Sequence, residues 1–194
     1  MYQFFLQIIY HLFGKIGSNY EILKTLVHNA QFAWHYNEAA VFTGDKEQWD
    51  NPLGHNFVDH PFYAHTVLER PSPHCCYPTV RSGHVELIHR ILREIFEHNN
   101  IPWMVPENEG STTCLYRVNI NATEPGMTGY GYPHVDHDFP HKNMLVYLTD
   151  AGGETVCEGE VYNPEEDDII TFEGRHYQGL SNTKRRIVLV VTYL

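Results

Sequence analysis

The sequence is poor in basic residues, because 13 lysines and arginines stand against 24 aspartates and glutamates, for a formal net charge of −11. A face that binds nucleic acid needs clustered lysine and arginine side chains to neutralise phosphates. The charge balance therefore argues against nucleic acid as the resident partner. The expected partners are small molecules or a peptide.

Cysteine is also scarce. The four cysteines are Cys75, Cys76, Cys114 and Cys157, and no Cys-x-x-Cys pair occurs. Adjacent Cys75 and Cys76 are poorly placed to bond each other, and the spacing fits a thiolate zinc site badly. We therefore expect reduced, buried and inert thiols in a cytoplasmic protein.

The most apolar stretch, Met1–Phe13, is too short to span a bilayer and contains three polar residues, Gln3, Gln7 and His11. No basic residue precedes it and no small-residue cleavage site follows it, so a signal peptide is not indicated. We expect this stretch to pack on the domain as a helix or strand. A contact with a second copy or with a membrane surface is the alternative, and the oligomeric state stays open.

The chain does have enough apolar surface for a core, with 42% hydrophobic and 13% aromatic residues among 194. Apolar residues at helical spacing predict a helix at His84–Asn99 and a weaker one at Tyr20–Val27. Residues from Trp34 to Gly83 are rich in histidine, proline, glycine and aromatics, and predict long ordered loops. Residues 1–110 are thus expected to form a helical and loop-rich support region.

Residues 111–194 predict short strands separated by glycine turns. The expected strands are Thr113–Asn121, Asn143–Leu148, Thr155–Cys157, Asp168–Phe172 and Arg186–Leu194. Short strands in quick succession favour a mainly β jelly roll over a parallel α/β sheet. We expect one structural domain, in which this β core carries the chemistry and the first part packs on it with flanking helices.

The segment His134-Val135-Asp136 places an imidazole and a carboxylate two residues apart. In an extended chain such residues point the same way, so both side chains can bind one metal ion. His176, just after the expected strand Asp168–Phe172, is the candidate third ligand. Two histidines and one carboxylate on one face of an octahedron leave open positions, the arrangement found in non-haem iron(II) oxygenases.

Three neighbouring residues, His137, Asp138 and His141, are weaker candidates for ligands. No histidine stands two residues before Asp138, so the same pairing cannot be built on it. We expect these residues to surround the site or to face solvent.

The last strand opens with two arginines, Arg185 and Arg186. A buried arginine at the start of a strand can hold a carboxylate through two parallel hydrogen bonds. Either arginine is a candidate on this argument alone.

The order of these features resembles the 2-oxoglutarate- and iron(II)-dependent dioxygenases, and among them the prolyl 4-hydroxylase-like branch. The resemblance covers about residues 111–194, whereas residues 1–110 resemble only loosely some phage-encoded members. The segment from Leu145 to Leu148 is similar to the strand whose tyrosine contacts 2-oxoglutarate. The segment Gly152-Gly153-Glu154-Thr155 is similar to a turn of that family.

The resemblance implies a double-stranded β-helix, the cupin-like jelly roll, in which His134, Asp136 and His176 hold Fe(II) and serve catalysis. It favours Arg186 over Arg185 as the anchor of the far carboxylate of 2-oxoglutarate, because the family has an aliphatic residue three positions later. The residues expected to bind this co-substrate are Arg186, Tyr147, Leu145, Thr155 and Val188.

The implied reaction is hydroxylation of a C–H bond, with release of succinate and carbon dioxide. A peptidyl proline is one substrate that the resemblance suggests, small molecules are others, and ascorbate is a further cofactor that it allows. Two alternatives stay open. One is a cupin-like metal enzyme that does not use 2-oxoglutarate, and the other is a non-catalytic binding module.

Overall fold

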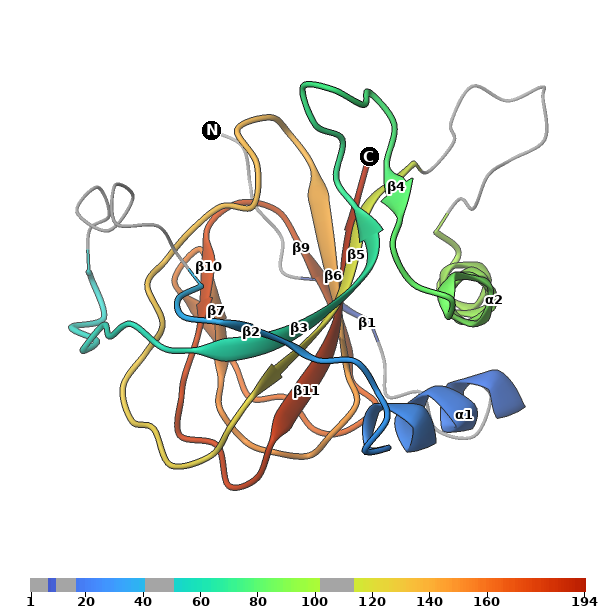
Figure 1. Ribbon diagram of the computed structural model, residues 1–194. Coiled ribbons are helices and arrows are strands. Elements are labelled where there is room, and N and C mark those ends of the chain that lie inside the picture. The colour runs from blue at the N-terminus through green and yellow to red at the C-terminus, as the bar shows by residue number, and fades with distance from the viewer. Residues whose placement is uncertain (1–6, 10–16, 41–50, 102–113) are drawn as a thin grey trace.

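The computed structural model describes residues 7–9, 17–40, 51–101 and 114–194, and folds them into two β-sheets and two helices (Figure 1). The strands are Gln7–Ile9 (β1), His35–Asn37 (β2), Phe62–Glu69 (β3), Thr79–Val80 (β4), Leu115–Thr123 (β5), Lys142–Tyr147 (β6), Thr155–Cys157 (β7), Glu160–Tyr162 (β8), Ile169–Phe172 (β9), His176–Gln178 (β10) and Arg186–Tyr193 (β11). The helices are Ser18–Val27 (α1) and Val85–His98 (α2). The larger sheet has the order β1-β9-β6-β11-β5-β3-β2, with β4 beside β3, and the smaller sheet has the order β10-β7-β8.

The helices cover one face of the larger sheet. Apolar residues of α2 recur every three or four positions, which places them on a single face that is fully buried. This face shares one core cluster with α1 and with alternate residues of β5, β6 and β11. Figure 1 shows both helices on one side of the larger sheet, with β7 and β10 on the other side.

A second, smaller core fills the space between the two sheets. Along β11, Ile187 and Leu189 face the helices, whereas Val188 and Val190 face this inner space, as strand alternation requires. The buried members of the inner cluster are Leu145, Tyr147, Cys157, Ile170, Phe172 and Val188. Two antiparallel sheets packed face to face around such a core form the predicted jelly roll, so the predicted fold class is confirmed.

Both predicted helices and the five strands predicted after residue 110 are present, with small shifts at their ends. The loops predicted between Trp34 and Gly83 were wrong in part, because β3 crosses this region and pairs with β5. Side chains on both faces of β3 are at least partly buried, so no alternation of polar and apolar residues marks it in the sequence. The division of the chain at residue 110 stays a prediction.

The stretch Met1–Phe13 is described only at Gln7–Ile9, which forms β1 and pairs with β9 as a strand packed on the domain. The remainder of that stretch lies outside the described residues. Within the described ranges, no helix is long and apolar enough to cross a membrane.

The four cysteines are free. The prediction that they are buried was correct for Cys157 and wrong for Cys75, Cys76 and Cys114, which are exposed. The first two lie in a turn between β3 and β4, and Cys114 precedes β5, so none of these three faces a core.

Candidate functional site

Backbone pairing brings His134 and His176 together, although they are far apart in the sequence. The amide nitrogen of each donates to the carbonyl oxygen of the other at 3.0 Å, which forms an isolated antiparallel bridge beside β10. The two imidazole rings lie with their centroids 4.5 Å apart. Strand pairing therefore sets the spacing of these two side chains.

The three predicted metal ligands converge. One donor atom from each of His134, Asp136 and His176 lies within 4.8 Å of the other two, and Nε2 of His176 is 3.7 Å from Oδ2 of Asp136. Among the residues that the structure describes, no other three histidine, cysteine or acidic side chains meet in this way. The neighbouring His137 and His141 are therefore not brought into such a group.

The histidine rings are oriented to offer Nε2 to a ligand. Nδ1 of His134 lies 3.1 Å from the carbonyl oxygen of Tyr132, and Nδ1 of His176 lies 3.4 Å from that of Gly174. A carbonyl oxygen can only accept, so each Nδ1 carries a proton, and in the neutral ring Nε2 is the nitrogen that keeps a lone pair. Such backbone bonds are the usual outer contacts of metal-binding histidines.

Asp136 leaves one carboxylate oxygen unsatisfied. Its Oδ2 is buried and has no hydrogen-bond partner in the part of the chain that the structure describes. A buried carboxylate oxygen without a partner calls for an explanation, and the binding of a cation provides one. Two free imidazole nitrogens beside such an oxygen are the donor set that suits a divalent transition metal.

The protonation states also suit a metal. Burial, and next the neighbouring His134, lower the pKa of His176 to about 4, so its ring is neutral near pH 7. Burial alone would raise the pKa of Asp136, but His176, His134 and Arg117 together hold that pKa below its ordinary value. At neutral pH His176 therefore offers a neutral imidazole and Asp136 an ionised carboxylate, the forms that bind a metal ion.

Arg117 was not predicted from the sequence. From β5, its Nη1 lies 3.5 Å from Oδ1 of Asp136, the oxygen that does not face His176. With the Asn119 amide oriented to satisfy its neighbours, its oxygen accepts from Nε and Nη2 of Arg117 at 3.3 and 2.8 Å. Asn119 thus holds the Arg117 guanidinium in place, and the guanidinium in turn stabilises the position of the Asp136 carboxylate.

Arg186 is buried between the two sheets, with 6% of its surface exposed. Its Nη2 donates to Oγ1 of Thr155 at 2.9 Å, and its Nη1 donates to Oε1 of Gln178. The Tyr147 hydroxyl lies 2.7 Å from the same Thr155 oxygen, and the Arg186 guanidinium carbon lies 5.3 Å from the centre of the Tyr147 ring. Three of the predicted co-substrate residues, Arg186, Tyr147 and Thr155, therefore form one hydrogen-bonded group.

No carboxylate among the described residues pairs with Arg186, and burial lowers the pKa of its guanidinium. A buried cation without a counter-ion is costly. The two other predicted pocket residues, Leu145 and Val188, line the same inner space through the apolar cluster around Tyr147. The pocket therefore suits an anionic ligand, and the role of each residue toward it stays a prediction.

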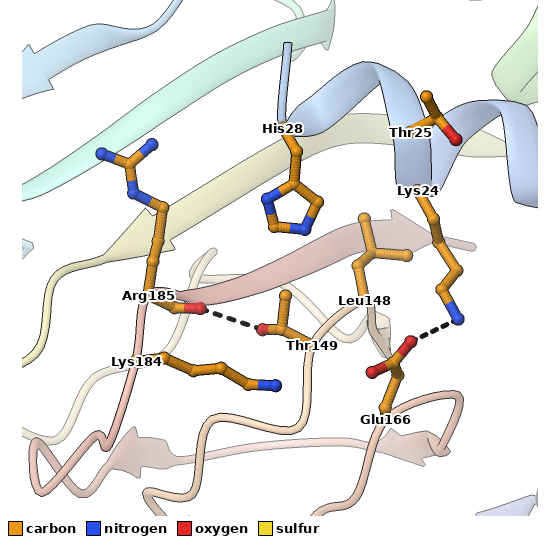
Figure 2. Close-up of a pocket in the computed structure, with 8 residues that line it drawn as sticks. All are labelled: Lys24, Thr25, His28, Leu148, Thr149, Glu166, Lys184 and Arg185. Atoms are coloured by element: carbon orange, nitrogen blue, oxygen red, sulfur yellow. Dashed lines mark hydrogen bonds and ion pairs between the residues drawn. The ribbon is translucent and has the colours of Figure 1, made fainter. Parts of the chain in front are cut away.

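Arg185 directly precedes β11, and its side chain points away from the inner pocket. It pairs with Glu124 and borders a surface hollow of about 390 Å³ next to α1 (Figure 2). In Figure 2 the Thr149 hydroxyl donates to the carbonyl oxygen of Arg185, and Lys24 pairs with Glu166 at one side of the hollow. Of the two candidate arginines, only Arg186 is directed into the inner pocket.

No protein-family model and no curated protein matches this sequence. Among solved structures, an oxidoreductase of the 2OG-Fe(II) oxygenase family from Burkholderia pseudomallei is similar with a TM-score of 0.60 and 15% identity, over 89% of this chain and 78% of that one. A prolyl hydroxylase from Trichoplax adhaerens, in complex with a hypoxia inducible factor peptide fragment, is similar with a TM-score of 0.55 and 11% identity, over 97% of this chain and 83% of that one. The chain therefore has the double-stranded β-helix fold of these oxygenases.

Proposed function

We propose that the protein is a dioxygenase that depends on iron(II) and 2-oxoglutarate and hydroxylates a C–H bond. One observation carries the proposal. Buried Arg186, which pairs with no carboxylate among the described residues, donates to Gln178, two residues after His176 of a His-Asp-His group that fits a divalent metal. A metal-binding group alone would also suit a cupin-like enzyme of another reaction type. The buried arginine adds a place for a second, anionic group.

The spacing of the two parts suits a short keto dicarboxylate. On β10, His176 and Gln178 stand on either side of buried Tyr177, so their side chains share one face of the strand. Gln178 contacts Arg186, and two residues along a strand span roughly 7 Å. One molecule of 2-oxoglutarate can thus reach the metal-binding group with its keto acid end and Arg186 with its far carboxylate.

Iron(II) held by His134, Asp136 and His176 would supply the activation of dioxygen, coupled to oxidative decarboxylation of 2-oxoglutarate to succinate and carbon dioxide. The chain's own residues would bind and orient the reactants. Arg186 and the Tyr147 hydroxyl would anchor the far carboxylate, and the apolar cluster between the sheets would exclude water from the pocket.

For the substrate, we propose a peptidyl proline as the first candidate to assay, with small molecules next. The Trichoplax prolyl hydroxylase is solved with a peptide fragment on this fold, which supports a peptide as a candidate, although the fold itself does not select a substrate. Ascorbate belongs in the assay as the auxiliary cofactor that the family resemblance allows.

The test is the formation of succinate from 2-oxoglutarate by the iron-loaded protein, with and without a proline-containing peptide. We expect succinate formation to require Fe(II) and to be lost in His134→Ala and in Asp136→Ala. His98→Ala, which removes an exposed histidine at the end of α2, is the matched control and should retain activity. Succinate formation that persists in both ligand variants would contradict the proposal, and metal binding without succinate would favour the cupin-like alternative.

A further inference from the structure

Gln178 uses both ends of its amide inside the pocket. Its Oε1 accepts from Nη1 of Arg186, while its Nε2 lies 2.9 Å from Nε2 of His60 and 3.2 Å from Oγ1 of Thr123. A guanidinium group can only donate, so the amide oxygen has to face Arg186 and the amide nitrogen has to face His60 and Thr123. The orientation of Gln178 is therefore set by its partners.

His60 supplies the acceptor that holds the amide nitrogen. The ring is buried, with 4% of the residue exposed, and Nε2 can accept only if the proton sits on Nδ1. Burial, and next the nearby His134, lower the pKa of His60 to about 4, which is consistent with this neutral tautomer. Gly131 makes room for the ring, because a Cβ at that position would lie 2.6 Å from Cε1 of His60.

Gln178 is paired across the smaller sheet with Thr155, the other hydrogen-bond partner of Arg186. Cross-strand partners in an antiparallel pair point to the same face. Two neutral oxygens from β10 and β7 therefore receive the two terminal nitrogens of a guanidinium group that comes from β11. These two side chains of the smaller sheet orient Arg186, and because both are uncharged they leave its positive charge unneutralised.

We propose that Gln178 is the positioning residue of Arg186, and that its uncharged amide keeps this arginine available to the far carboxylate of the co-substrate. Two other arginines of the chain do pair with carboxylates, Arg117 with Asp136 and Arg185 with Glu124. A glutamate in place of Gln178 would be nearly identical in size, but its carboxylate would form a charge-assisted pair with Arg186 and compete with the ligand. This inference rests on the proposed function.

The test compares Gln178→Glu, Gln178→Met and wild type in calorimetric titrations of the Mn(II)-loaded protein with 2-oxoglutarate. We expect Gln178→Glu to weaken binding by roughly tenfold or more, because the strongest ionic contact of the ligand is taken by the protein. Gln178→Met keeps the length but loses both hydrogen-bonding ends, so a smaller loss is expected. Gln31→Glu adds the same charge in an exposed turn and should leave the affinity unchanged.

Two further readouts separate positioning from a general structural role. Gln178→Glu should keep the wild-type Mn(II) affinity and a melting temperature close to that of wild type. The new carboxylate pairs with a buried cation, and its second oxygen can accept from Nε2 of His60 once that nitrogen carries the ring proton. Wild-type affinity for 2-oxoglutarate in Gln178→Glu would overturn the inference, as would a loss that comes with unfolding or with lost Mn(II) binding. Failure of wild type itself to bind 2-oxoglutarate would overturn the proposed function, and the inference with it.

Discussion

His134 and His176 exchange two backbone hydrogen bonds of 3.0 Å, so the main chain holds their imidazoles side by side. The bridge continues the smaller sheet beyond β10, and it depends on no side chain of the site. A metal ion would therefore meet two histidines whose backbones are already fixed. Such preorganisation reduces the ordering that binding requires.

Replacing His176 with alanine tests whether the backbone bridge forms without the imidazole that binds the metal. We expect His176→Ala to keep the fold, because the backbone bridge remains. Mn(II) affinity should fall by roughly a hundredfold or more, because loss of a ligand costs more affinity than loss of a residue that only contacts a ligand. Calorimetry with Mn(II) and a thermal melt measure the two effects. Unchanged Mn(II) affinity would remove His176 from the ligand set.

Arg117→Met should weaken the metal site without removing a ligand. The arginine steadies Oδ1 of Asp136 at 3.5 Å, and loss of an outer contact of this kind lowers metal affinity by about 10- to 100-fold. Arg93→Met, which changes a half-exposed arginine on α2, is the control and should bind Mn(II) as wild type does. Equal affinities in the two variants would show that Asp136 does not need Arg117.

The two adjacent arginines should differ sharply in their effect on the co-substrate. Arg186→Met removes the buried cation of the inner pocket, so 2-oxoglutarate affinity should fall by roughly a hundredfold or more, at unchanged Mn(II) affinity. Arg185→Met removes an ion pair with Glu124 and a contact with the Tyr63 ring, and should leave 2-oxoglutarate affinity within about twofold of wild type. A loss in Arg185→Met with none in Arg186→Met would reverse the assignment.

The stability of the metal-free protein should fall as the pH is lowered from 7 to 4. His60 has a pKa of about 4 in the folded state against about 6.5 in the unfolded chain, so the unfolded state binds more protons between these values. The stabilising contribution of His60 is complete above about pH 6.5 and is lost as the pH falls towards 4, on the order of 2–3 kcal/mol. His176 acts in the same direction.

Thermal melts at several pH values measure this effect. His60→Gln cannot titrate and still offers an acceptor to Gln178, so its melting temperature should decline less steeply between pH 6.5 and 4. An equally steep decline in wild type and variant would mean that His60 does not contribute to the pH dependence.

Site residues could be predicted from the sequence where the direction of a side chain follows from the local geometry of a strand. The i, i+2 spacing of His134 and Asp136 and the alternation of Arg186 and Val188 on a strand predict which way these side chains point, and the structure has them so. Gln178 could have been found by the same alternation, since it stands two residues after His176.

Other parts could not be predicted because they depend on long-range pairing. Strand β3 is covered on both faces and shows no alternation, and Arg117 meets Asp136 only through the placement of β5 beside the metal-binding segment. His60 comes from a segment between β2 and β3 with no pattern of its own, and its role follows from packing against Gly131.

The most direct test of the central claim is an anaerobic titration of the metal-free protein, first with Fe(II) and then with 2-oxoglutarate, followed by visible absorption. A keto acid that chelates iron(II) gives a weak charge-transfer band. We predict that this band appears in wild type and is absent in His176→Ala and in Arg186→Met at the same ligand concentration. Iron binding without the band in wild type would contradict the assignment of 2-oxoglutarate, and no iron binding at all would contradict the metal centre itself.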